Sequence, residues 1–93
     1  MAKDPLAFQR ELLGLINARF PGATRGNVEQ NDQASAELAM ALGALLAFAF
    51  RLNGEVIGRT VLNTITTKII ENATAIDDEA GGAIRLHLEK TKN

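Results

Sequence analysis

The chain has 93 residues, of which 46% are apolar, and its formal net charge is −1. This length predicts one domain over residues 1–93, and the apolar fraction is typical of a folded protein. Residues 1–51 carry five basic and five acidic side chains, so strong electrostatic binding to nucleic acid or anionic lipid is not expected. The absence of cysteine excludes disulfides and thiolate chemistry and fits a cytoplasmic location.

The first predicted helix covers about residues 5–20. Asp4 is a suitable N-terminal capping residue, and Pro5 suits the first helical position. Pro21 and Gly22 end the pattern. The apolar residues recur at helical spacing, namely Leu6, Leu12, Leu13, Ile16 and Phe20.

The second predicted helix follows a polar loop at residues 21–31. Asn27 and Gln30 have the spacing of a capping box, which allows the helix to begin at residue 28, and Asp32 is the other candidate cap. The helix is expected to end near Leu52, because Asn53-Gly54 favours a left-handed residue at a helix C-terminus.

The second helix contains the longest apolar run of the chain, thirteen residues from Leu38 to Phe50, bordered by Glu37 and Arg51. As a helix this run spans about 20 Å, whereas a bilayer core is about 30 Å thick. We therefore interpret it as a core helix rather than a membrane span, and we expect no membrane partner.

Large and small side chains separate around this helix. Leucines gather on one side, and small residues gather on the opposite side, where another backbone can approach closely. Gly43 costs a helix about 0.5–1 kcal/mol relative to alanine, which favours a packing role. The candidate contact, made either within the chain or with a second copy, consists of Ala36, Ala39, Gly43 and Ala47.

A third helix is predicted at about residues 60–76, after a short connection or extended segment at residues 55–59. Its threonine and isoleucine content favours a strand, but its period favours a helix. The polar residues Thr64, Thr67, Lys68 and Glu71 fall opposite one apolar face, which consists of Leu62, Ile65, Ile69, Ala73 and Ile76.

Beyond a predicted turn at residues 77–82, Ile84, Leu86 and Leu88 alternate with polar residues. Strict alternation predicts a half-buried strand, which needs a pairing partner. The partner is either residues 55–60 or the same strand in another copy, and one or two helical turns are the competing interpretation. The predicted fold class is mainly α: a three-helix domain with a short C-terminal strand or helical turn, completed by homodimerisation.

The sequence has little that predicts catalysis, a metal site or a cofactor. Ser35 is the only serine and His87 the only histidine, and no activating pattern surrounds either. Asp77, Asp78 and Glu79 lack the spaced ligands of a calcium loop. We therefore expect a protein that is not an enzyme and has no resident cofactor.

Three functions remain open. The first is a small oligomeric interaction, scaffold or accessory protein, whose partner is itself or another protein. The second is a nucleic-acid-binding regulator with a helix-turn-helix-like pair, although its few basic residues make nucleic acid an unlikely partner. The third is a binder of an apolar small molecule beside the small-residue side. The candidate nucleic-acid contacts are Arg59, Asn63, Thr67 and Lys68.

Overall fold

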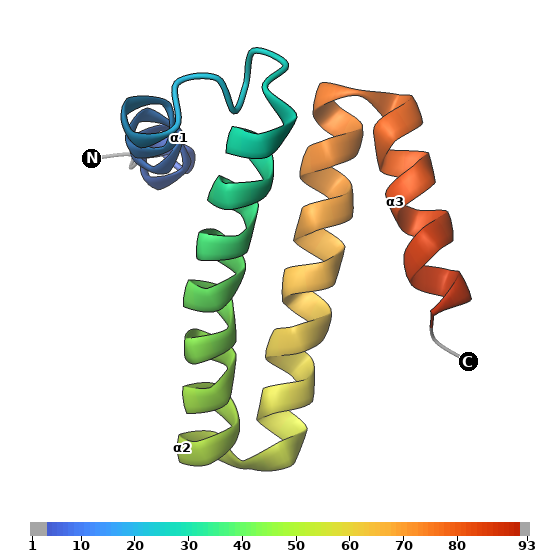
Figure 1. Cartoon of the computed structure of the whole chain (residues 1–93). Helices are drawn as coiled ribbons and strands as arrows, with labels where there is room; N and C mark the ends of the chain where they lie inside the picture. Colours follow the sequence, from blue (N-terminus) through green and yellow to red (C-terminus); the bar gives the residue numbers. More distant parts are fainter. Residues whose placement is uncertain (1–3, 92–93) are drawn as a thin grey trace. The chain divides into compact units, whose positions relative to one another are not determined.

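The computed structural model describes residues 4–91, which contain three α-helices and no strand. They are α1 (Ala7–Arg19), α2 (Val28–Ile76) and α3 (Asp78–Lys90), shown in Figure 1. The mainly α prediction is therefore confirmed. Contacts within the chain divide it into two compact units, Met1–Ala44 and Leu45–Asn93, which are described separately below. The expectation that residues 1–93 form a single domain stays a prediction.

The start of α1 depends on Asp4. Its carboxylate accepts a hydrogen bond from the backbone N–H of Leu6 at 2.9 Å and forms an ion pair with Arg10. The N–H of Ala7 also donates to the backbone carbonyl of Asp4. The predicted helix at residues 5–20 is confirmed, and its observed ends lie one or two residues inside the predicted ones.

Asn27 caps α2, so the helix begins at Val28 rather than after Asp32. The side-chain oxygen of Asn27 accepts a hydrogen bond from the N–H of Gln30 at 3.0 Å. The side chain of Gln30 reaches back to accept from the N–H of Gly22 at 2.5 Å. This is a capping box whose second arm reaches the preceding loop instead of the capping residue, and it holds that loop against the helix.

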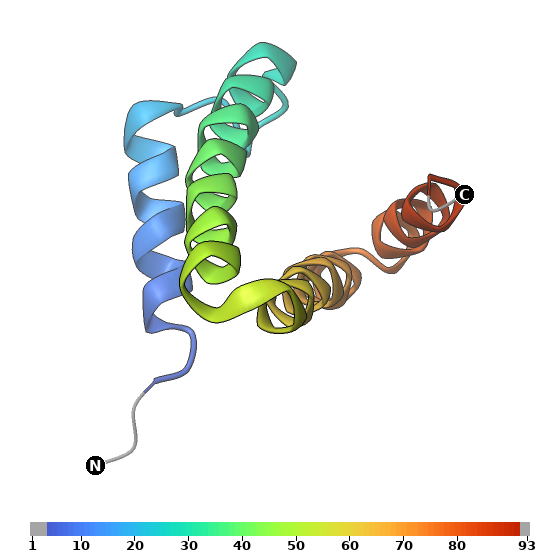
Figure 2. The same cartoon turned by 90° about the horizontal axis from the view of Figure 1, so that it is seen from below.

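The first unit has a thin apolar layer where α1 lies beside the start of α2 (Figures 1 and 2). A shallow hollow there is lined by both helices, through Leu15, Ile16, Arg19, Phe20, Ala34, Glu37, Leu38 and Ala41. Among the apolar residues described, only Ala23 in the loop and Ala34 in α2 are buried. This unit therefore leaves many of its large apolar side chains in contact with solvent.

In the second unit, the helical conformation of α2 is interrupted at Gly54 and resumes at the next residue, Glu55. Gly54 has φ 85° and ψ 174°, and every other residue of α2 is helical, so α2 consists of a first segment (residues 28–53) and a second segment (residues 55–76). The positive φ confirms the predicted end of the first segment. The predicted connection at residues 55–59 is wrong, because these residues form the first turn of the second segment.

The helical turn at residues 55–59 has two local causes. Glu55 and Arg59 form an ion pair at 2.7 Å with the i, i+4 spacing that stabilises a helix. Gly58 is buried, and a Cβ atom on it would lie 2.5 Å from Cγ of Phe50. The phenyl ring thus packs directly on the backbone of the second segment, and only glycine leaves space for it.

The threonine hydroxyl groups of the second segment find acceptors inside the helix. Thr60, Thr64 and Thr74 each donate to the carbonyl four residues earlier, at 3.0, 3.0 and 2.7 Å. Such bonds satisfy a β-branched polar side chain without a cross-strand partner. The helical period was therefore the correct guide, and the strand propensity of these residues was overridden.

Helix α3 replaces the predicted C-terminal strand, and it is longer than the competing prediction of one or two turns. Asp77 caps it, since its carboxylate accepts from the N–H groups of Glu79 at 3.0 Å and Ala80 at 3.4 Å. Ile84 and Leu88 are half-buried, whereas Leu86 is exposed. The i, i+4 spacing thus decides burial. The alternation of Ile84, Leu86 and Leu88 was too short to distinguish a strand from a helix.

We predict that Gly54→Ala lowers the free energy of unfolding by about 1–3 kcal/mol, because the observed backbone conformation is nearly restricted to glycine. Thermal unfolding followed by circular dichroism measures the change. Gly14→Ala is the control, since α1 has open space at that position and alanine there should stabilise the helix by about 0.5–1 kcal/mol. Equal stability of Gly54→Ala and the wild type would contradict the break.

The adjacent pair Gly81 and Gly82 tests the orientation of α3. A Cβ atom on Gly81 would lie 2.7 Å from Cα of Thr74, whereas one on Gly82 meets open space. We expect Gly81→Ala to lower the melting temperature and Gly82→Ala to raise it, because alanine is favoured by about 0.5–1 kcal/mol in an unobstructed helix. The same response from both variants would show that α3 does not present Gly81 to Thr74.

Candidate interaction surface

Large apolar side chains remain exposed over much of the described chain, including all three helices. Sixteen such residues are exposed between residues 4 and 91. Contiguous exposed apolar surface is uncommon in soluble monomers and is typical of contact sites. In the first segment of α2, Val28 is 80% exposed, Leu52 74%, Met40 73%, Leu45 61% and Phe48 55%.

The first segment of α2 carries exposed large apolar side chains, among them Met40, Leu45 and Leu52. Helix α2 is long and apolar enough to cross a membrane by length and composition alone, and none of its most apolar window is buried. Core helices of soluble proteins pass the same composition test.

The four small residues predicted as a packing contact, Ala36, Ala39, Gly43 and Ala47, are all exposed. A Cβ atom on Gly43 would have no neighbour within 4 Å. The predicted contact, within the chain or with a second copy, stays a prediction. Close approaches to a glycine backbone are found instead at Gly22, Gly58 and Gly81, which no sequence pattern distinguished because the facing residues were unknown.

Glu37 and Arg51 are the charged residues that border the apolar run, and both are exposed. Neither side chain has an ion pair or hydrogen bond within residues 4–91, unlike the acids and bases paired at Asp4–Arg10, Glu55–Arg59 and Glu71–Lys68. The two residues are fourteen positions apart, which is about four helical turns, so they lie on the same side of the helix.

The predicted nucleic-acid contacts are exposed on the second segment of α2. Each of the two basic side chains already has an acidic partner on that segment. Arg59 pairs with Glu55 at 2.7 Å, and Lys68 pairs with Glu71 at 2.9 Å. The single-residue break at Gly54 also differs from the three- or four-residue turn of a helix-turn-helix pair. These observations weaken the nucleic-acid interpretation.

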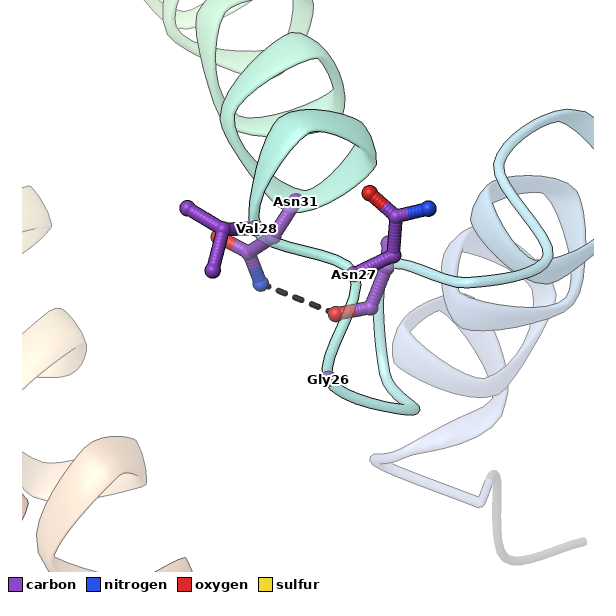
Figure 3. A pocket seen from close by; sticks show the side chains of 5 residues that line it. Gly26, Asn27, Val28 and Asn31 are labelled. Atoms are coloured by element: carbon purple, nitrogen blue, oxygen red, sulfur yellow. Dashed lines mark hydrogen bonds between the residues drawn. The ribbon is translucent and has the colours of Figure 1, made fainter.

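A small hollow lies at the start of α2 (Figure 3) and is lined by Ala23, Gly26, Asn27, Val28 and Asn31. The side-chain amide of Asn31 donates to the carbonyl of Ala23 at 3.0 Å, which ties the loop to the helix. The hollow beside α1 and this one both lie away from Ala39, Gly43 and Ala47. Neither therefore supports the predicted apolar ligand site beside those residues.

The residues considered for catalysis and metal binding lie in different helices or at a helix cap. Ser35 lies in α2, where its hydroxyl donates to the side-chain oxygen of Asn31 at 3.4 Å, and His87 lies in α3. The carboxylate of Asp77 caps α3. Within residues 4–91, no group of three or more histidine, cysteine, aspartate or glutamate side chains could hold a metal ion.

No protein-family model matches the sequence. No curated protein is significantly similar to it, and no solved structure is either.

We predict that the protein does not bind duplex DNA measurably at low salt, because Arg59 and Lys68 are already paired with neighbouring acids. Fluorescence anisotropy with a labelled duplex tests this. Salt-dependent binding that is weakened when Arg59 and Lys68 are both changed to alanine would contradict the prediction and support a nucleic-acid regulator.

Proposed function

We propose that this protein is a non-enzymatic interaction or scaffold protein that acts as a homodimer or higher oligomer in the cytoplasm. The observation that carries the proposal is the exposure of Met40, Phe48 and Leu52 on the most apolar helix of the chain. Burying an exposed side chain of this size contributes about 1.5–3 kcal/mol. A second copy is the simplest source of that burial, because it carries the same apolar surface.

The charges around the apolar run favour a protein partner over a membrane. A helix that spans a bilayer needs about 20 residues, and the apolar run has thirteen, from Leu38 to Phe50. Any window of that length containing the run includes at least two charged residues, such as Glu37 with Arg51, or Arg51 with Glu55. At the edge of a protein interface these side chains remain hydrated.

The assignment to a non-enzymatic class is supported by the surroundings of the polar residues. Ser35 lacks the adjacent base that activates a serine nucleophile, because its hydroxyl bonds to the amide of Asn31. The exposed charged pairs Glu55–Arg59 and Glu71–Lys68 join neighbouring turns of one helix. This arrangement is typical of a solvated helix surface.

The experiment is sedimentation equilibrium of the full chain at micromolar concentrations, without detergent, accompanied by circular dichroism. We expect a folded dimer or higher oligomer whose melting temperature rises with concentration, because association stabilises the folded state by mass action. A well-folded monomer would refute the proposal. Recovery of the protein only in membranes or detergent would also refute it and would favour a membrane partner.

A further inference from the structure

We propose that two copies of the first segment of α2 pair antiparallel about a twofold axis at Ala44. Glu37 of each copy then lies opposite Arg51 of the partner subunit. This inference rests on the proposed function and specifies the surface, direction and register of the association. Its starting observation is that Glu37 and Arg51 border an apolar run, share one side of a helix and have no partner for their side chains within residues 4–91.

The surface follows from the helical period. At 100° per residue, one side of the helix between residues 37 and 51 collects residues within about 60° of Ala44. All of them are exposed in the single chain: Glu37, Met40, Ala41, Ala44, Ala47, Phe48 and Arg51. Ala47 belongs to the small-residue group predicted from sequence, Ala36 and Gly43 lie at the edge of this surface, and Ala39 faces away from it.

The direction follows from charge. In a parallel pair, each Glu37 would lie beside the partner's Glu37, and each Arg51 beside the partner's Arg51. An antiparallel pair centred on Ala44 exchanges these like-charged neighbours for two Glu–Arg pairs, one at each end of the apolar run. Exposed pairs contribute little stability, but like charges placed together oppose association, so the pattern selects the direction.

The register also gives suitable packing at the centre. Ala44 lies opposite its own copy and Ala41 lies opposite the partner's Ala47, so the axes can approach closely where no large side chain separates them. One turn from the axis, the flexible side chain of Met40 lies opposite the partner's Phe48. A thioether beside an aromatic ring is a favourable contact, and it covers two exposed apolar side chains of the segment, Met40 and Phe48.

Helix α1 leaves this surface available. Its contacts with α2 in the first unit are with Ala34, Leu38 and the neighbouring residues of the hollow. Ala34 and Leu38 lie about 80° and 120° around the helix from Ala44. Two neighbours at roughly a right angle around one helix are the usual arrangement in a helix bundle. Glu37 and Ala41 lie at the boundary between α1 and the proposed partner.

Disulfide cross-linking tests the register directly, because the chain has no native cysteine. Chains carrying Met40→Cys and chains carrying Phe48→Cys are refolded together and oxidised. The antiparallel register predicts that mixed disulfides between positions 40 and 48 dominate, and that Ala44→Cys links to itself. Two copies of position 40 would be about 12 Å apart along the axis, beyond the Cα separation of about 7 Å that a disulfide allows.

The matched control is Ala39→Cys, an exposed alanine on the same helix that faces about 140° away from Ala44. We expect little cross-linking from it. Disulfides between two copies of position 40 would refute the antiparallel direction. Efficient disulfides at position 39 would show that the two helices meet through the side of α2 that contains Ala39. In both cases the protein would still be a dimer, so the proposed function would stand while this inference failed.

Charge exchange gives an independent measurement. Glu37→Arg and Arg51→Glu should each raise the dimer dissociation constant about ten-fold, because each creates two like-charged contacts. The double variant restores both Glu–Arg pairs and should return the constant to the wild-type value. Glu89→Arg, on exposed α3, is the control and should leave it unchanged. A double variant no better than the single ones would refute the pairing.

Discussion

The exclusion of apolar side chains from water is the constraint on which the rest of this molecule depends. The first segment of α2 carries apolar residues around its whole circumference, but its contacts within the first unit are with one short helix. Only small side chains, Ala23 and Ala34, are buried among the described apolar residues. A helix of this composition is stable when other surfaces complete its cover, and this requirement links the fold to the proposed association.

The second unit is organised by close backbone approaches rather than by large buried side chains. Phe50 packs on the backbone at Gly58, and Thr74 packs on the backbone at Gly81. Each contact joins helical residues separated by a short reversal, at Gly54 or at Asp77. Since a Cβ atom at either glycine would collide with its neighbour, these two positions specify the local packing more sharply than the surrounding aliphatic residues do.

Where the signals were local, sequence reasoning was accurate. Asn27 and Gln30 predicted the start of α2, and Asn53-Gly54 predicted the end of its first segment, because caps and positive-φ residues act within a few positions of each other. The prediction of a strand at Ile84, Leu86 and Leu88 was wrong. Asp77 caps a helix there, and Ile84 and Leu88 share one face of that helix. The prediction of a connection at residues 55–59 failed because a helix can restart directly after one glycine.

The sequence by itself determined the helical class, the Asn27 cap of α2 and the apolar run between Glu37 and Arg51, because these depend on residue type and spacing along one chain. Only the tertiary structure decided which glycines face a neighbour, since Gly43 meets open space while Gly58 and Gly81 do not. It also decided which large apolar side chains remain exposed. These properties depend on how one helical segment packs on another, which residue type and spacing alone do not encode.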